Sequence, residues 1–411
     1  MEYYDQLETR DAAEREAALF ATLPQFLERA RRAPGIAERL KGIVPSEIRD
    51  RAALARLPVL RKSELAESQS NDPPFGGFAA VSAGEAAHVF ASPGPLYEPA
   101  GPGPDFANFA RPLFAAGFRR GDLVYNTFSY HFTPAGLMVD AGARALGCAV
   151  FPAGIGQTEL QISAIANLKP QGYAGTPSFL RILLEKAGET GSDFTSLRKA
   201  LVSGEALPAP LRSQFTDRGI RVLQCYTTAE LGVVAYESEA REGLIVNEGL
   251  VLEIVRPGTD DPVPDGEVGE VVVTNLRSPE YPLIRFGTGD LSAILPGASP
   301  CGRTNARIRG WLGRADQSAK VRGMFVHPSL VAQILRRHDA IRSARLVIRR
   351  ENDADEMTLR CETASVGNEA LARAVVESIR EVCKLRGDVE LVAIGTLPND
   401  GKVIEDTRKL E

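Results

Sequence analysis

Residues 121–152, GDLVYNTFSYHFTPAGLMVDAGARALGCAVFP, contain the pattern that decides the fold class. A short apolar run at 121–125 is followed by a helix-like stretch at 135–146 and by a second apolar run at 148–152. Alternation of short apolar runs with helical stretches is typical of βαβ units, whose strands are parallel. The sequence therefore predicts an α/β domain built on a largely parallel sheet.

The same rhythm continues on the C-terminal side of this stretch. Expected helices and strands alternate there at 162–168, 172–174, 178–186 and 199–203. Before it, residues 1–70 have the three- and four-residue apolar spacing of helices. The Pro- and Gly-rich residues 91–104 are expected to form a loop.

After Cys225 the composition changes to strands separated by glycine and proline turns. Apolar runs at 250–255 and 269–274 flank the turn at 264–267, which predicts antiparallel hairpins. The sequence from about residue 313 then predicts a small α+β domain, with expected elements at 321–326, 328–337, 344–348, 357–361 and a helix capped by Asn368. We therefore expect a large N-terminal domain of α/β subdomains with a β-rich section over 1–312, and a small mobile α+β domain over 313–411.

Composition excludes several classes of protein. The 411 residues are 44% hydrophobic and 25% charged, with a net charge of −5, so no basic face for nucleic acid is indicated. The five cysteines form no CxxC pair, which argues against a disulfide framework or a zinc ribbon. The acidic N-terminus and the lack of an 18-residue apolar stretch predict a cytoplasmic protein that does not enter a membrane.

Local motifs alone do not identify a chemistry. The chain has no GxSxG elbow, HExxH helix or GxxxxGK[ST] loop, so hydrolase and Walker-type interpretations are set aside. Polar groups instead follow several expected strands, at 203–205, 226–230, 288–290, 313–316 and 401–402. Because ligands of open α/β sheets bind outside the carboxyl ends of the strands, these groups predict one shared cleft.

Four of these groups, in this order, resemble the AMP-forming acyl-CoA ligases, specifically the phenylacetate-CoA ligase branch. The resemblance rests on YTTAE at 226–230, PLIRFGTGD at 282–290, GRAD at 313–316 with KVRG at 320–323, and the pair Gly401-Lys402. Further stretches extend it over nearly the whole chain: 8–9, 57–62, 154–161 and 176–178.

The resemblance implies roles for five residues. Glu230 would hold Mg²⁺ beside the phosphates as a hard oxygen ligand, and Asp290 would accept hydrogen bonds from the ribose hydroxyls. Arg314 would bind ribose or phosphate oxygens, and Asp316 would be the hinge of the C-terminal domain. Lys402 would neutralise charge on the reacting carboxylate and α-phosphate. A surface salt bridge is the alternative for Arg314 and Asp316, and a solvated lysine is the alternative for Lys402.

The nucleotide and acyl pockets complete the expected site. Tyr226 would stack on adenine, with further nucleotide contacts from Ser92, Ser203, Gly204, Glu205, Thr227 and Thr228. Aromatic and imidazole surface for the acyl group would come from Tyr130, His131, Tyr173 and Phe179. Such aromatic residues are more often ordinary core.

The chain departs from the family in its phosphate loop. Where the family has Ser-Ser-Gly-Thr-Thr-Gly-Lys-Pro, only Ser92, Gly94 and Pro99 match. Pro93 and Pro95 lack the N–H donors that cradle phosphate, and Glu98 replaces the lysine. We therefore expect this loop to hold the triphosphate poorly. Three changes point the same way: Thr227, Ala229 and Gly287 stand where the family has Gly, Thr and Arg.

A second departure concerns zinc. Relatives in this branch can bind a structural zinc partly through Cys-Pro-Cys-Gly-Arg, whereas this chain has SPCGR at 299–303 and Glu237-Ser238 where another cysteine would be expected. One thiol does not complete a four-ligand shell, so no zinc is predicted.

The leading hypothesis is an ATP-dependent carboxylate-CoA ligase, using Mg²⁺, that activates an aromatic or small carboxylic acid as an acyl-adenylate and transfers it to CoA. One alternative is an adenylating enzyme with a carrier protein or an amine as acceptor. Another is a catalytically silent member that binds AMP or an acyl-adenylate. The resemblance also allows a homodimer.

Overall fold

The computed structural model describes residues 2–92, 96–315, 319–321, 324–351 and 354–408. The chain divides into two compact units, which are described separately. The first contains residues 1–252, 273–286 and 295–311, and the second contains 253–272, 287–294 and 312–411. The expected division at 312/313 stays a prediction. No helix in the described ranges is long and apolar enough to cross a membrane.

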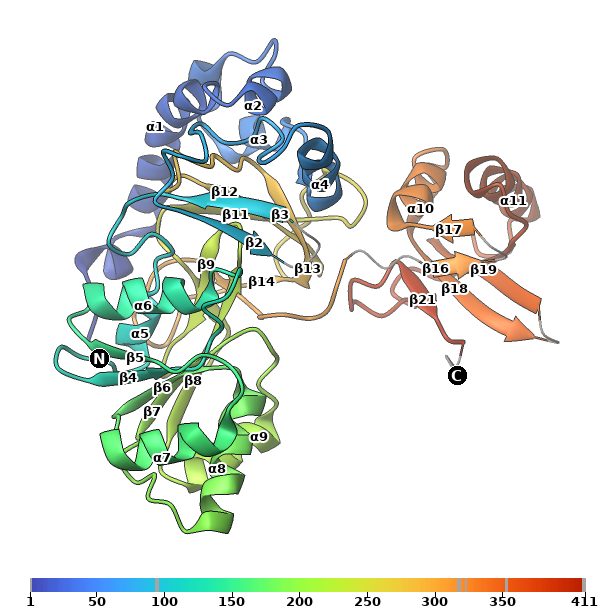
Figure 1. Ribbon diagram of the computed structural model, residues 1–411. Helices are drawn as coiled ribbons and strands as arrows, with labels where there is room; N and C mark the ends of the chain where they lie inside the picture. The colour runs from blue at the N-terminus through green and yellow to red at the C-terminus, as the bar shows by residue number, and fades with distance from the viewer. Residues whose placement is uncertain (1, 93–95, 316–318, 322–323, 352–353, 409–411) are drawn as a thin grey trace. The chain divides into compact units, whose positions relative to one another are not determined.

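A nine-stranded mixed sheet organises the first unit (Figure 1). Its order is β14-β15-β10-β9-β8-β7-β6-β4-β5. The strands span β4 Leu123–Asn126, β5 Ala149–Pro152, β6 Gly172–Gly175, β7 Lys199–Val202, β8 Arg221–Thr228, β9 Gly232–Glu237, β10 Leu244–Val246, β14 Ile294–Leu295 and β15 Arg307–Ile308. Pairing is parallel from β5 through β8 and antiparallel from β8 to β15. The predicted parallel α/β core is confirmed.

Helices cover both faces of this sheet because successive strand residues point to opposite sides. Val124 and Ala174 pack with α5 and α6 in one buried cluster, whereas Tyr125 and Tyr173 pack with α7, α8 and α9 in another. These helices span α5 Ala110–Ala115, α6 Ala135–Ala145, α7 Thr158–Leu168, α8 Pro177–Thr190 and α9 Ala209–Asp217. Figure 1 shows α5 and α6 on one side of the sheet and α7 to α9 on the other.

The N-terminal segment is helical, as its apolar spacing predicts. Asp11 caps the longest helix by accepting hydrogen bonds from the N–H groups of Ala13 and Glu14. The elements are η1 Gln6–Thr9, α1 Ala12–Ala30, α2 Pro34–Arg39, η2 Pro45–Glu47, α3 Arg51–Ala55, β1 Leu60–Arg61 and α4 Lys62–Asn71. The apolar stripe of α1, from Leu19 to Leu27, is buried.

A two-stranded hairpin replaces part of the loop expected at 91–104. Strand β2 His88–Ser92 pairs antiparallel with β3 Leu96–Ala100, in a register that sets Ser92 opposite Leu96. Proline is tolerated in such an edge strand, where Pro99 needs no donor to a further strand. The expectation of an irregular loop was therefore wrong for the second strand.

A four-stranded sheet follows the order β1-β13-β12-β11. Its longer strands are β11 Leu250–Val255, β12 Gly269–Asn275 and β13 Phe286–Ser292. The second unit has its own sheet, β20-β19-β18-β21, and the hairpin β16-β17. These strands are β16 Ala319–Val321, β17 Met324–Val326, β18 Ile341–Glu351, β19 Ala354–Thr363, β20 Asp388–Val392 and β21 Ile404–Asp406.

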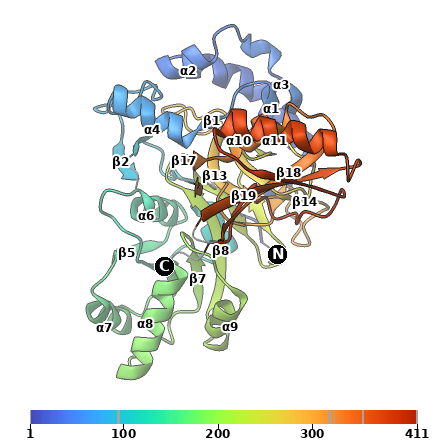
Figure 2. The ribbon, with the colours of Figure 1, turned by 90° about the vertical axis from the view of Figure 1, so that its right-hand side faces the viewer.

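Two helices, α10 Pro328–Leu335 and α11 Glu369–Cys383, pack on the sheet of the second unit (Figure 2). Their apolar side chains, including Val331 and Ile379, join Leu346 and Leu359 of the sheet in one buried cluster. Asn368 caps α11 by accepting the N–H of Leu371, as predicted. The predicted α/β fold with a small α+β part is therefore confirmed.

Candidate active site

The polar groups after β7 and β8 meet at one edge of the parallel sheet. Register pairs Val202 with Gln224, so the residues that follow these positions lie side by side. The hydroxyl of Ser203 donates to the Cys225 carbonyl at 2.7 Å and lies 3.0 Å from Thr227 Oγ1. The predicted convergence of these two strand ends is thus present in the structure.

Glu205 and Tyr226 occupy the edges of this group. Glu205 is exposed and accepts a hydrogen bond from Ser178 Oγ at 2.9 Å, at the first turn of α8. Tyr226 is half-buried within the last residues of β8, and Thr228 Oγ1 accepts the N–H of Leu231 at 3.2 Å. The Glu205 carboxylate is therefore directed to a helix N-terminus, which favours an acid there.

A cavity of about 480 Å³ opens beside these strand ends in the first unit. The strand ends contribute Thr176, Gly204, Thr227, Thr228 and Ala229, and Ser92 comes from β2. Apolar lining comes from Phe109, Phe128, Met138, Ile155 and Phe179. Since none of the described lining residues carries a charge, the cavity suits an uncharged, apolar group.

Of the four residues expected to form the acyl pocket, Phe179 lines this cavity. Tyr173 is fully buried, and its hydroxyl accepts from Thr127 Oγ1 at 2.8 Å and donates to the Thr176 carbonyl at 3.0 Å. Tyr130 accepts from Asn126 Nδ2 at 2.8 Å, and His131 is exposed. Burial raises the pKa of both tyrosines far above the ordinary value. Tyr130, His131 and Tyr173 are not among the lining residues. Because Tyr173 hydrogen-bonds to Thr127 and Thr176, which do line the cavity, it supports the wall from behind.

The large apolar lining residues Phe109, Phe128, Met138 and Ile155 were not predicted from the sequence. One signal could have found Phe128, because it follows the end of β4 by two residues and ligands bind at such strand ends. Met138 lies inside α6, where helical periodicity also predicts an ordinary core residue. No local pattern separates it from the rest of the core.

Glu230 and Glu98 belong to one buried acidic cluster. Glu230 Oε1 lies 2.6 Å from the Lys62 ammonium, and the carboxylate is almost fully buried. Glu98 is 2% exposed and accepts a hydrogen bond from Ser92 Oγ at 2.7 Å. Burial, and secondarily the charge of Glu230, raises the pKa of Glu98 to about 8, although Ser92 and Lys62 act in the opposite direction. Ser92 is therefore engaged by Glu98, and Glu230 by Lys62.

In the second unit, Asp290 and Arg314 contact each other. They form an isolated antiparallel bridge, and Arg314 Nη1 lies 3.2 Å from Asp290 Oδ1. Asp290 is buried while Arg314 is exposed, which matches the salt-bridge alternative for Arg314. The hinge prediction at Asp316 lies outside the described residues.

Lys402 lies in an anchored loop of the second unit. Asn399 exchanges two hydrogen bonds, of 3.2 and 3.3 Å, with the backbone of the turn at 264–268. The Asp400 carboxylate accepts the N–H of Lys402 at 3.0 Å and is paired with the buried Arg345. These contacts fix the backbone on the N-terminal side of Lys402, whose side chain is exposed.

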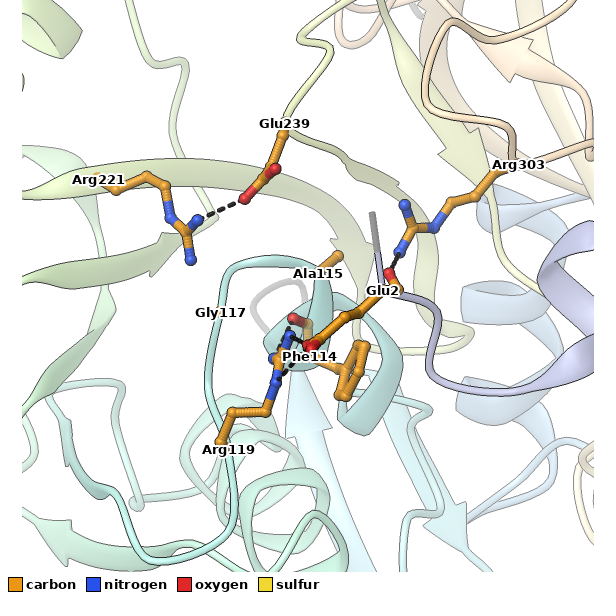
Figure 3. A pocket seen from close by; sticks show the side chains of 8 residues that line it. All are labelled: Glu2, Phe114, Ala115, Gly117, Arg119, Arg221, Glu239 and Arg303. Carbon is orange, nitrogen blue, oxygen red and sulfur yellow. Dashed lines mark hydrogen bonds and ion pairs between the residues drawn. The ribbon is translucent and has the colours of Figure 1, made fainter.

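A second cavity, of about 360 Å³, is polar and lies elsewhere in the first unit (Figure 3). Arg119 pairs with Glu2 at 2.6 Å, and Arg221 pairs with Glu239. Arg303 lies 2.7 Å from the buried carboxylate of Glu8. Because each of these arginines has an acidic partner, the cavity is a poor candidate for an anion site.

No group of three or more acidic, histidine or cysteine side chains that could hold a metal occurs in the described parts of the chain. Cys301, the counterpart of the zinc-binding segment, is buried and contacts Ser299 Oγ at 3.1 Å. Hydrogen bonds from Ser238, Ser299 and Arg303 lower the pKa of this thiol, although its burial acts to raise it. Serine and arginine therefore surround the thiol.

The fold and the cavity define a class of protein. A parallel sheet whose strand ends present hydroxyl and backbone groups to an apolar cavity is an α/β protein that binds a nucleotide or a similar small molecule. Comparisons of the sequence with known families agree with this class. The AMP-binding enzyme family matches residues 107–276, and the AMP-binding enzyme C-terminal domain matches residues 323–408.

Characterised relatives cover most of the chain. Phenylacetate-coenzyme A ligase of Thermus thermophilus is 34% identical over 84% of this chain and 81% of its own length. The protein of the same name from Aromatoleum evansii is 31% identical over 83% and 81%, respectively. The chain therefore belongs to the AMP-binding enzyme family, among the AMP-forming acid–CoA ligases.

Solved structures give the same result. A 2-hydroxyisobutyryl-CoA ligase in an open conformation, in complex with 2-HIB-AMP and CoA, has a TM-score of 0.72 and 28% identity, and covers 95% of this chain and 90% of that chain. The same ligase in the thioesterification state has a TM-score of 0.71. The family resemblance predicted from the ordered motifs is thus confirmed.

Proposed function

We propose that this chain activates an aromatic or small carboxylic acid with ATP and transfers the acyl group to CoA. A carboxylate oxygen of the acid attacks the α-phosphorus of ATP, and pyrophosphate leaves. The thiol sulfur of CoA then attacks the acyl carbon, and AMP leaves. The observation that carries the proposal is the 480 Å³ cavity, which places apolar side chains beside the polar ends of β7 and β8.

The cavity supports an acid with an uncharged body. Phe128, Met138 and Phe179 offer apolar and aromatic contact to the body of the acid. A second carboxylate or an ammonium on the acid would be desolvated there without a charged partner among the described lining residues. Phenyl-substituted and short branched acids are therefore the expected substrates.

In this proposal, three charged side chains bind the nucleotide or its metal ion and stabilise charge during the reaction. Lys402 neutralises charge on the reacting carboxylate and α-phosphate, and Asp290 accepts the ribose hydroxyls. Glu230 has the hard oxygen donors that Mg²⁺ prefers, and Mg²⁺, when bound, neutralises phosphate charge. The ion pair between Glu230 and Lys62 is the interaction that the metal would replace.

The acceptor distinguishes this proposal from its alternatives. CoA is the acceptor proposed here, since the relatives that cover most of this chain are named phenylacetate-coenzyme A ligases. A carrier-protein phosphopantetheine or an amine would act on the same acyl carbon, and an assay with each acceptor separates them. A homodimer is tested by the mass of the protein in solution.

The proposal is tested by acid-dependent exchange of labelled pyrophosphate into ATP, without CoA, over a panel of phenyl-substituted and short aliphatic acids. Exchange with any acid establishes adenylation and identifies its class. Absence of exchange with the whole panel, in a protein that binds AMP, would favour the catalytically silent alternative instead.

Lys402→Ala tests the assigned lysine. We expect the exchange rate to fall by about 100- to 1,000-fold, because one preorganised charge is lost from the transition state. AMP affinity should change less than about twofold. Lys41→Ala, at an exposed lysine paired with Glu38, is the matched control. An unchanged exchange rate in Lys402→Ala would remove Lys402 from the mechanism.

A further inference from the structure

The loop that carries Lys402 is held on one side by the sheet of its own unit. Arg345 of β18 is buried, and its guanidinium donates to the Pro398 carbonyl at 3.1 Å. It also pairs with Asp400, whose carboxylate accepts the Lys402 N–H at 3.0 Å. These contacts fix the loop relative to β18. They do not decide where the loop lies relative to the residues assigned to the nucleotide.

A second anchor, Asn399, ties the same loop to the turn directly before β12. Asn399 Oδ1 accepts the Val268 N–H at 3.2 Å, and Asn399 Nδ2 donates to the Gly266 carbonyl at 3.3 Å. The turn is itself held, because the Gly266 N–H donates to the Ile294 carbonyl at 3.0 Å. A side-chain amide that donates and accepts at once fixes the orientation of the loop as well as its distance.

Gly401 shows how closely the loop approaches this turn. Its φ of +71° lies in the left-handed region, which favours glycine. A Cβ at this position would lie 2.5 Å from Val268 Cγ1 and 3.1 Å from Leu291 Cδ1. The residue directly before Lys402 therefore packs against the start of β12 and against β13.

The turn belongs to the sheet that carries Asp290. Val268 directly precedes β12, β12 neighbours β13, and Asp290 lies on β13. In the proposed function, Asp290 binds the ribose and Lys402 acts on the reacting carboxylate and α-phosphate. Asn399 thus joins the loop of one of these residues to the sheet of the other.

We propose that Asn399 is a positioning residue that holds the Lys402 loop in place for adenylation. This inference rests on the proposed function, because it takes Lys402 as the residue that stabilises charge in that step. The lysine ammonium lies at the end of a flexible four-carbon stem, so its placement depends on a fixed backbone. Misplacement by about 1 Å can cost about 100-fold in rate. Asn399 takes no part in bond making: the carboxylate oxygen bonds to the α-phosphorus, and pyrophosphate leaves.

Asn399→Ala tests the inference in the acid-dependent exchange of labelled pyrophosphate into ATP. We expect the maximal exchange rate to fall about tenfold or more. The KM for ATP and the affinity for AMP should change less than about twofold, because Asp290 and the strand ends of the first unit are unaltered. In the Lys402→Ala background, the same substitution should change the exchange rate less than about twofold, because no lysine is left to position.

Asn368→Ala is the matched control, because it removes a hydrogen bond of another side-chain amide in the same unit, to the Leu371 N–H. It should leave the exchange rate within about twofold of wild type. An unchanged rate in Asn399→Ala would overturn the inference. A further tenfold loss in the double variant would also overturn it, because Asn399 would then act through another group. Absence of exchange in the wild type with every acid would instead overturn the proposed function, and the inference with it.

Discussion

Two regions border the same cavity but are built in opposite ways. At the ends of β7 and β8, hydroxyl groups pair with each other and with backbone, as Ser203 does with Cys225 and Thr227. In the β2–β3 hairpin, a serine pairs with a buried acid, Glu98. The contacts at the strand ends join hydroxyl and backbone groups, whereas the hairpin places the carboxyl group of Glu98 near that of Glu230, which follows β8.

The difference shows which part of a ligand each region can hold. Neutral hydroxyl and backbone groups suit sugar, base and acyl parts, which carry no charge. A triphosphate needs cations and N–H donors, and the described residues of the hairpin, 88–92 and 96–100, include no lysine or arginine. The hairpin is therefore poorly suited to a highly charged part of a ligand.

The acid of the hairpin should make stability depend on pH. An unfolded glutamate ionises near pH 4.5, whereas the pKa of Glu98 in the folded chain is about 8. The contribution of Glu98 to the free energy of unfolding is therefore largest below pH 4.5. This contribution decreases as the pH rises to about 8, by at most about 1.4 kcal/mol per pH unit. Glu98→Gln should lack this loss.

Urea unfolding of wild type and Glu98→Gln at pH 5, 6, 7, 8 and 9 measures the effect. The difference in unfolding free energy should grow in favour of Glu98→Gln up to about pH 8 and then level off. In the wild type, the titratable groups that interact with Glu98 are Glu230, Lys62 and Tyr281. Parallel pH curves for the two proteins would show that Glu98 is ionised in the folded state.

The strand ends should be sensitive to added volume. A Cβ at Gly175 would lie 2.0 Å from Thr127 Oγ1 and 2.3 Å from Tyr173 Oη, whose hydrogen bond supports the wall of the cavity. Gly175→Ala should cost about 1–3 kcal/mol of stability through overpacking. Thermal unfolding checks this against Gly188→Ala in α8, where a Cβ meets nothing within 4 Å.

The control variant, Gly188→Ala, should leave the free energy of unfolding unchanged or raise it by up to about 1 kcal/mol, because alanine is favoured over glycine inside a helix. Equal melting temperatures for Gly175→Ala and Gly188→Ala would mean that the strand ends relax easily. The strand ends would then tolerate added volume as well as an open helix position does.

The smallest effect is expected at Ser203. Ser203→Ala removes the hydrogen bond to the Cys225 carbonyl and should cost about 1 kcal/mol of stability. AMP affinity should change less than about twofold, because the Ser203 hydroxyl is already used inside the protein. Calorimetry checks this, with Ser163→Ala at an exposed helix position as control. A large loss of AMP affinity would place the hydroxyl on the nucleotide.

Much of the fold could be read from local periodicity. The runs at 121–125 and 172–174 became β4 and β6, and Asn368 caps α11 as expected. The irregular loop expected at 91–104 was wrong in part, because proline content describes local propensity and not pairing. Strand β3 forms because its partner, β2, is adjacent in the fold.

The site was predictable to a smaller extent. Two residues expected at the site, Gly204 after β7 and Thr227 near the end of β8, line the cavity because these strand ends share an edge. The aromatic residues Tyr130 and Tyr173 were placed in the acyl pocket, but Tyr173 lies behind its wall. Aromatic character does not show which face of an element a side chain occupies.

By itself the sequence determined the alternation of strands and helices, the family and the loss of the phosphate-loop lysine, since each is a property of residues close together in the chain. The tertiary structure alone decided that Glu98 is buried with Ser92, near Glu230, and that Lys62 pairs with Glu230. Ser92 and Glu98 are six residues apart, but Lys62, Glu98 and Glu230 come from segments far apart in the sequence. Their geometry follows from how the β2–β3 hairpin, α4 and the end of β8 pack, and packing is a property of the whole fold.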